Sequence, residues 1–279
     1  MAKTVKRKPG SRRPLPAYAT LRVTIDHAVA SVVLDRPDVH NAFDETSIAE
    51  LTAALRQLGA DDSVRAVVLA GTGTSFCAGA DLRWMKRMAT FSDAQNLADA
   101  RALAGMLTTL NELPKPTIAR VHGAAFGGGV GLIACCDIAI ATQDAEFAFS
   151  EARLGLVPAT IAPYVVAAIG ERPARRLFLT AERFSAAEAF RLGLLHDLAM
   201  TSELDARIGE LLHALLRAGP RAQAECKTLL RAVSGRPIDV AAIEDTAARI
   251  ARVRASAEGR EGVAAFLARR NATWITGGE

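Results

Sequence analysis

The residues with the clearest chemical potential form a glycine-rich segment, VHGAAFGGGVGL, at positions 121–132. The run TIARV before it is typical of a strand, and VGLIACC after it is typical of a helix. Glycine has no side chain to keep a ligand away from the backbone, and the first N–H groups of a helix lack partners within the helix. The segment therefore predicts a turn that holds an oxygen atom carrying negative charge.

Other glycine-rich motifs fit this spacing less well. The run from Gly127 to Gly131 does not match G-x-G-x-x-G, and G-x-x-x-x-G-K-[ST] occurs nowhere, so neither a dinucleotide fingerprint nor a P-loop is supported. The oxyanion loop of a serine esterase would need a G-x-S-x-G elbow, which is also absent. From these residues alone, a purely structural role, in which the turn packs a helix against a strand, remains an alternative.

A second turn lies upstream, where VRAVVLA at 64–70 reads as a buried strand and GTGTSFCAGADLRWM follows. Its AGAD sequence, at 78–81, precedes the GGG run in the order that the enoyl-CoA hydratase/isomerase, or crotonase, superfamily shows. The chain resembles that superfamily over nearly everything after its first sixteen residues. Further similar blocks are RPDVHNAF at 36–43, LPKPTIARVHG at 113–123, CDIAIAT at 136–142, FAFSEARLGLVP at 147–158 and EGVAAFLARR near the C-terminus.

The resemblance implies a site for an acyl thioester. Hydrating a conjugated enoyl thioester, or moving its double bond, pushes negative charge onto the thioester oxygen, and the N–H groups of Ala80 and Gly128 would hold that charge. One such donor is typically worth about 3 to 4 kcal/mol in the transition state. Trp84, Met85 and Met88 would form the apolar wall of the acyl pocket, or part of the core. By the same resemblance, the substrate and its CoA moiety would contact Ala42, Ala78, Ala80, Asp81, Leu82, Arg83, Trp84 and Gly128.

The proton-transfer groups depart from the usual pattern of this superfamily. Typical hydratases carry one glutamate two residues after the GGG run, where this chain has Gly131, and a second in the later block, where it has Glu151. A carboxyl group in an apolar pocket has its pKa raised, which suits it to act as acid and base near neutral pH. The pattern predicts a hydro-lyase with Glu151 as its acid–base residue. An enoyl-CoA isomerase that uses the same glutamate without water is the alternative, and the identity of any second acid–base group stays open.

Several longer strings resemble the bacterial methylglutaconyl-CoA hydratase branch, including its isohexenylglutaconyl-CoA relatives. These strings are AFGGGVGLIACCDIAIA, SEARLGLVPATIAPYVV and ADLRWMKRM. The resemblance implies a substrate branched at C3 with a second carboxylate, such as 3-methylglutaconyl-CoA, and a place in leucine or fatty-acid metabolism. Gly131 would then leave extra room in the pocket. Candidate partners for the second carboxylate are Arg83, Lys86, Arg87 and Arg153.

The composition of the chain argues against several other classes of protein, including metal-binding and membrane-spanning proteins. At 279 residues, half of them hydrophobic, the chain can bury one large core. The four cysteines show no C-x-x-C or metal-like grouping, so we expect reduced, packing thiols, a cytoplasmic protein and no metal site. No apolar run suggests a membrane span. No cofactor is expected, because CoA is part of the substrate.

His122 could take part in catalysis, but local hydrogen bonds are the simpler prediction for its side chain.

The basic charge is local to the N-terminus. Residues 1–13 hold six positive charges and no acid, and removing these six from the net charge of +4 leaves the remainder at −2. Three prolines by position 16 oppose an amphipathic helix, and an apolar h-region is missing, so we expect a disordered tail over 1–16 and no targeting peptide. No membrane or nucleic-acid partner is expected. A CoA-binding scaffold, or a nucleic-acid binder that uses this tail, is the non-enzymatic alternative.

The remaining periodicities predict the elements that position these residues. A hairpin is expected at 21–35, a helix capped by Asp44 after it, a helical stretch at 92–111, and further strands at TIARV and DIAIA. Such alternation is typical of an α/β protein. Apolar stripes beyond Leu204 predict a helical last third. The resemblance implies a crotonase-like spiral of ββα units over 17–203 and a C-terminal helical region over 204–279 that forms a homotrimer, or a hexamer of two trimers.

Overall fold

The computed structural model describes residues 16–275 of the chain. The tail expected at 1–16 therefore lies, apart from its last residue, outside the described residues. Strands and helices alternate along most of the chain, which confirms the predicted α/β class. None of the helices in the described part is long and apolar enough to cross a membrane.

A six-stranded sheet forms the base of the molecule, with the strand order β1-β2-β3-β5-β7-β10. β1 and β2 pair in antiparallel fashion as the predicted hairpin, and the remaining pairs are parallel. The central strands read as nearly continuous apolar runs because both of their faces are covered. The bounds are β1 Leu21–Asp26, β2 Val29–Leu34, β3 Ala66–Gly71, β5 Thr117–Val121, β7 Ile138–Thr142 and β10 Asp197–Ala199.

A second, four-stranded sheet of short strands has the order β4-β6-β8-β9. Its strands are β4 Ser75–Cys77, β6 Ala124–Phe126, β8 Glu146–Ala148 and β9 Arg183–Ser185. The prediction that the strand at TIARV leads directly into the glycine turn is wrong. Gly123, at φ +58°, turns the chain out of the first sheet, and β6 then adds a strand to the second sheet before the helix begins. Successive units thus place one strand in each sheet.

Helices cover both faces of the six-stranded sheet. Asp44 accepts a hydrogen bond from the backbone N–H of Ser47 and so caps the first helix, as predicted. The helices are α1 Glu45–Ala60, α2 Leu82–Met88, α3 Asp93–Asn111, α4 Gly128–Cys135, α5 Ala162–Ile169, α6 Glu171–Thr180, α7 Ala186–Leu192, α8 Leu204–Arg217, α9 Pro220–Val233, α10 Val240–Ala255 and α11 Ala257–Leu267, with short 3₁₀ turns at η1 Pro37–Val39 and η2 Glu151–Leu154.

Alternate residues of the sheet serve two separate apolar clusters. Val67 and Leu69 of β3 belong to a large core that includes buried residues of α1, α3, α4 and α5. Val68, between them, faces a smaller cluster closed by Leu204 and Ile208 of α8. The alternation follows from the strand geometry, in which successive side chains point to opposite faces. The stripe predicted from Leu204 onward therefore packs against the sheet.

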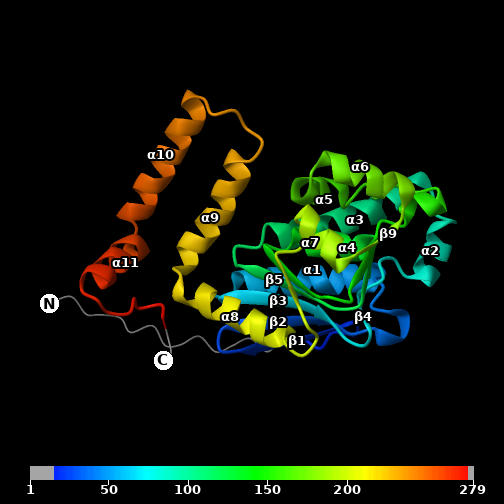
Figure 1. The fold of residues 1–279 in the computed structure, drawn as a ribbon, viewed down its shortest axis with the longest axis horizontal. Coiled ribbons are helices and arrows are strands. Elements are labelled where there is room, and N and C mark those ends of the chain that lie inside the picture. Colours follow the sequence, from blue (N-terminus) through cyan, green and yellow to red (C-terminus); the bar gives the residue numbers. More distant parts are fainter. Residues whose placement is uncertain (1–15, 276–279) are drawn as a thin grey trace.

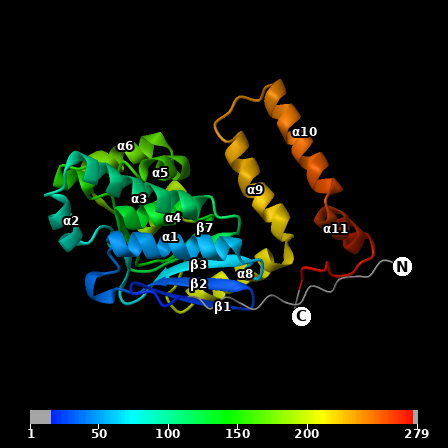
Figure 2. The same cartoon turned by 180° about the vertical axis from the view of Figure 1, so that it is seen from behind.

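The last three helices stand apart from this body. Figures 1 and 2 both show α9, α10 and α11 as an arm separated from the helices that cover the sheets. Halfway along α9, the Lys227 Nζ lies 2.7 Å from the Asp137 carboxylate and donates to the Lys115 carbonyl, which ties the arm to the body. Helix α10 has no buried residue, although Ile243, Ala247, Ile250 and Val253 form one of the predicted apolar stripes along it. The helical character of the last third is confirmed.

Candidate active site

The two predicted turns lie side by side at one edge of the four-stranded sheet. β4 and β6 are parallel neighbours, so their carboxyl ends meet at the same edge, where ligands commonly bind in such sheets. A Cβ atom built on Gly79 would lie 2.8 Å from the Phe126 carbonyl oxygen and 3.6 Å from the Gly128 nitrogen. The structure thus brings together the AGAD turn and the GGG turn.

Two backbone N–H groups at this edge have no protein partner within the described chain. The Phe43 N–H donates to the Gly79 carbonyl and the Asp81 N–H donates to the Phe43 carbonyl, so the Ala80 N–H points away from Phe43. Gly128 is the first residue of α4, where an N–H finds no acceptor within the helix. Neither N–H forms a hydrogen bond to another described residue.

Gly127 fixes the entry of the chain into α4. It adopts φ +50° and ψ −119°, which a residue with a side chain rarely does. A Cβ atom at this position would also lie 3.0 Å from Oε1 of Glu151. The backbone conformation therefore favours glycine, and a side chain at this position would also press against the Glu151 carboxylate.

Glu151 begins the 3₁₀ turn η2, which follows β8, the neighbour of β6. Its Oε2 atom is buried and has no hydrogen-bond partner among the described residues. Burial raises the pKa of the Glu151 carboxyl above its ordinary value, against a smaller opposing effect of its own backbone N–H. An unpartnered buried carboxylate is costly, and such groups gather where proton transfer occurs. The arrangement suits an acid–base group.

A cavity of about 300 Å³ joins these features. Of the predicted site residues it is lined by Ala78, Ala80, Leu82, Trp84, Gly128 and Glu151. Its walls are mostly apolar and include the predicted Met85 and Met88. Trp84 is only 2% exposed, so it belongs to the core and to the cavity wall at once. No lysine or arginine of the described residues lines the cavity.

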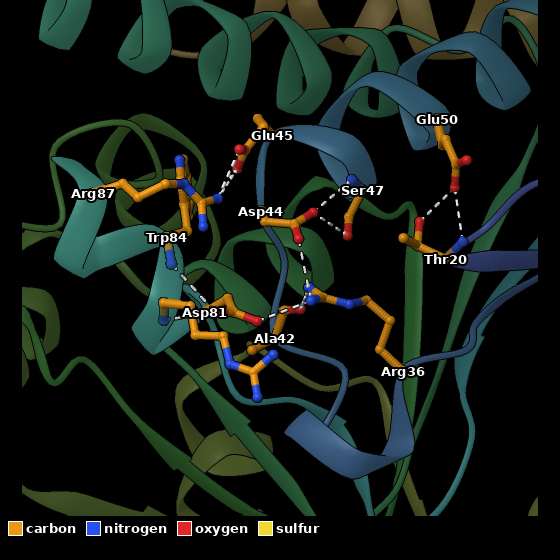
Figure 3. A network of polar contacts seen from close by, with 11 residues as sticks. Thr20, Arg36, Ala42, Asp44, Glu45, Ser47, Glu50, Asp81, Trp84 and Arg87 are labelled. Carbon is orange, nitrogen blue, oxygen red and sulfur yellow. Dashed lines mark hydrogen bonds and ion pairs between the residues drawn. The ribbon is translucent and has the colours of Figure 1, made fainter. Parts of the chain in front are cut away.

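Asp81, in contrast, serves the scaffold. Figure 3 shows its carboxylate at the start of α2, facing Arg36. It accepts hydrogen bonds from the backbone N–H groups of Arg83 and Trp84, and Nη2 of Arg36 lies 2.9 Å from its Oδ2. Burial alone would raise the pKa of Asp81, but the two N–H groups and the Arg36 charge together hold it below its ordinary value.

Arg36 joins this cap to the neighbouring elements. Its guanidinium lies 3.1 Å from the Asp44 carboxylate that caps α1 and donates to the Ala42 carbonyl at 2.5 Å. The network in Figure 3 therefore ties the starts of α1 and α2 to the segment that pairs with Ala80. Ala42, Asp81 and Arg83 do not line the cavity, and their predicted contacts with CoA stay predictions.

The four cations predicted to bind a second carboxylate also lie outside the cavity lining. Arg87 pairs with Glu45, its Nη2 lying 2.6 Å from Oε1. Arg83, Lys86 and Arg153 are exposed. Their role toward a substrate carboxylate stays a prediction.

The expectation that Gly131 leaves extra room is wrong. A Cβ atom on Gly131 would lie 2.2 Å from Cγ2 and 2.9 Å from Cβ of Ile161. The side chain of Ile161 therefore already occupies the space that a residue at 131 would need.

Asp99 is a cavity residue that the sequence analysis missed. It lines the cavity from α3, and its Oδ1 accepts a hydrogen bond of 3.2 Å from the Trp84 indole N–H. Burial raises the pKa of Asp99, the Trp84 bond opposes this, and the Glu45 charge adds to it. Its only signal in the sequence is the helical spacing to Leu103, which lines the same cavity.

The remaining candidates have structural surroundings. Nε2 of His122 lies 2.9 Å from the Gly73 carbonyl, and His122 does not line the cavity, in keeping with the simpler prediction. Cys135 and Cys136 are buried, as expected of packing thiols. Burial raises the pKa of the Cys136 thiol to about 12. No group of three or more potential metal-ligating side chains occurs within residues 16–275.

Several known proteins are similar to this chain in sequence and in architecture. Residues 24–277 match the family model for enoyl-CoA hydratase/isomerase. An enoyl-CoA hydratase from Shewanella pealeana, of known structure, is 46% identical with a TM-score of 0.89, covering 91% of this chain and 96% of its own. A crotonyl-CoA hydratase from Syntrophomonas wolfei is 30% identical over 93% of this chain and 99% of its own. An enoyl-CoA hydratase of Alternaria alternata, ACTT6, is 36% identical over 87% and 80%.

The resemblance seen in the sequence is thereby confirmed at the level of the superfamily, and so is the crotonase fold. The matches do not single out the methylglutaconyl-CoA hydratase branch. The chain belongs to the enoyl-CoA hydratase/isomerase family.

Proposed function

We propose that this protein adds water across the double bond of an enoyl-CoA thioester, with Glu151 as its one acid–base residue. The observation that carries the proposal is the buried Oε2 of Glu151, which has no partner among residues 16–275 and shares a cavity with Ala80 and Gly128. A water molecule would supply the missing hydrogen bond. The enzymatic class, a lyase acting on enoyl-CoA, follows from the family.

In the proposed reaction, ionised Glu151 accepts a proton from water while the water oxygen bonds to C3 of the substrate. The π bond between C2 and C3 breaks and its electrons form a double bond between C1 and C2, while the π electrons of the thioester carbonyl move to its oxygen and give an enolate. The N–H groups of Ala80 and Gly128 stabilise that oxygen. The enolate then takes the proton from Glu151 at C2, which restores the carboxylate. One carboxyl group thus serves both proton transfers, and no external acid or cofactor enters the balance.

An isomerase reaction is the alternative. Glu151 would remove a proton from C4 and return it to C2, with the same two N–H groups stabilising the dienolate. The non-enzymatic alternative, a CoA-binding scaffold or a nucleic-acid binder acting through the N-terminal tail, predicts no turnover of any enoyl-CoA. The raised pKa and missing partner of Glu151 favour catalysis over that alternative.

The finer substrate prediction, 3-methylglutaconyl-CoA or a related branched glutaconyl-CoA, stays a prediction with little support from the cavity. The space beside Gly131 is filled by Ile161, and the charged groups among the lining residues are Glu151 and Asp99. A substrate carboxylate would face these acids without a cation, since no described lysine or arginine lines the cavity. The cavity therefore favours an uncharged acyl group.

Assembly into homotrimers or hexamers is likewise a proposal, supported by exposed apolar side chains on the arm. Ile243 and Ile250 of α10 are 55% and 48% exposed, and Phe266 of α11 is 83% exposed. Contiguous exposed apolar surface is typical of protein interfaces. Light scattering of the purified protein tests the oligomeric state. The cytoplasmic location, the metabolic role and the absence of cofactor, membrane or nucleic-acid partners stay predictions.

A panel of enoyl-CoA thioesters tests the proposed function. The purified protein should hydrate crotonyl-CoA, measured as loss of the conjugated-thioester absorbance, and kcat/KM for 3-methylglutaconyl-CoA should be lower by about tenfold or more. A preference for the dicarboxylate would restore the branch-level prediction. No hydration of any thioester would contradict the proposal itself.

A further inference from the structure

Ile161 stands between the acyl cavity and the helix that carries the glycine turn. It is 1% exposed and lines the cavity beside Glu151 on one side. On its other side, its Cγ2 atom lies 2.2 Å from the position of a Cβ on Gly131. Cδ2 of Leu107 is the next atom to that position, at 3.7 Å. Gly131 and Ile161 therefore form a matched pair in which the absence of one side chain accommodates the other.

The main chain of Ile161 is held in place. Ile161 is the residue that precedes α5, and its carbonyl accepts hydrogen bonds from the N–H groups of Tyr164 and Val165 at 3.1 and 3.0 Å. Withdrawal of its main chain from the cavity would require the start of α5 to move. The isoleucine thus forms a fixed part of the cavity wall.

The pair lies close to the reacting end of an acyl group. Gly131 follows Gly128 by three residues in α4, which places both on one side of the helix about 4.5 Å apart along its axis. If the Gly128 N–H binds the thioester oxygen, the atoms next to Ile161 are the first carbons beyond the thioester. A substituent at C3 would meet Ile161, whereas the far end of a long chain would not.

We propose that Ile161 determines substrate specificity by excluding substituents at C3 of the acyl group. The inference rests on the proposed function, and it adds that the site is shaped for unbranched 2-enoyl thioesters. Ile161 acts by its volume and takes no part in proton transfer.

Replacing Ile161 with alanine should open the cavity toward Gly131. The test measures the dissociation constants of two unreactive thioesters, butanoyl-CoA and 3-methylbutanoyl-CoA, by calorimetry. We expect Ile161→Ala to shift their ratio by about tenfold in favour of the branched thioester, because one methyl group in an apolar pocket is worth roughly 10- to 200-fold. The ratio of kcat/KM for 3-methylcrotonyl-CoA and crotonyl-CoA should move in the same direction.

Leu107→Ala is the matched control. It removes the same number of carbons from the other side chain near Gly131, at a buried residue that does not line the cavity. It should lower stability and leave both ratios within about twofold of the wild type, well inside the expected shift. If Ile161→Ala fails to fold, Ile161→Val should give a smaller shift of the same sign.

An unchanged ratio in Ile161→Ala, or an equal shift in Leu107→Ala, would overturn the proposal, as would an unchanged ratio in Ile161→Val where that variant alone folds. Failure of the proposed function has a different signature. The wild-type protein would then bind neither thioester, or bind both without hydrating any enoyl-CoA.

Discussion

The two sides of the acyl cavity differ at the positions where this family commonly carries a carboxylate. On one side, Glu151 has a buried carboxyl oxygen with no hydrogen-bond partner in the described part of the chain. On the other, Gly131 has no side chain, and the space is filled by Ile161. The side chain of Ile161, and not an empty space, therefore occupies the region next to Gly131, where similar hydratases carry their second carboxylate. Under the proposed function, the whole demand for proton transfer would fall on Glu151.

Removing the carboxylate on the first side should have the largest effect. Glu151→Gln keeps the shape of the side chain but cannot accept a proton from water, so kcat for crotonyl-CoA hydration should fall by about 10²- to 10⁴-fold. The dissociation constant of butanoyl-CoA, measured in parallel, should change little. Turnover near the wild-type level would show that Glu151 is not the acid–base residue.

The donor side of the cavity can be tested with two substitutions at Gly128. Proline is compatible with the first position of a helix but removes the N–H, while alanine keeps it. Both add a Cβ atom, which would meet the Phe43 ring at 2.2 Å, so this clash is common to the two variants, and the proline ring adds two further carbons. Gly128→Pro should lower kcat about 10²- to 10³-fold below that of Gly128→Ala. Equal rates in the two folded variants would remove the N–H from the mechanism.

Adding a carboxylate on the second side, at Gly131, should destabilise the folded protein. Gly131→Glu must displace Ile161 and bury a charge, so we expect the free energy of unfolding to fall by about 1 to 3 kcal/mol or more. Chemical denaturation measures this loss. Introducing Ile161→Ala into the same protein should restore part of it, because the atoms in contact are then removed. Wild-type stability in Gly131→Glu alone would show that the space is free.

A single working carboxylate also predicts a simple pH dependence. Glu151 must be ionised to take a proton from water, and burial raises its pKa, so activity should be lost as pH falls through a value above the ordinary glutamate pKa of about 4.3. Below that pKa, kcat/KM for hydration should fall about tenfold per pH unit. Asp99→Asn is the control and should keep the same acid limb. A steeper limb, or one that Asp99→Asn removes, would indicate a second titrating group.

Elements that depend on local sequence patterns could be predicted, whereas contacts between residues distant in sequence could not. The helix that begins after Asp44 and the site at Glu151 were predictable, because a cap, an apolar stripe and a family motif are local signals. The three-residue strands of the second sheet were missed, since so short a run shows no alternation. The pairing of Gly131 with Ile161, and that of Arg36 with Asp81, joins residues distant in sequence, so spacing could not reveal either.

Hydration in water labelled with heavy oxygen tests the central claim most directly. The wild-type protein, Glu151→Gln and a protein-free control would be incubated with crotonyl-CoA in this water, and the products analysed by mass spectrometry. We expect a 3-hydroxyacyl thioester that carries one solvent oxygen, formed by the wild type and nearly absent from the variant. A product with a shifted double bond and no solvent oxygen, or labelled product formed equally by both proteins, would contradict it.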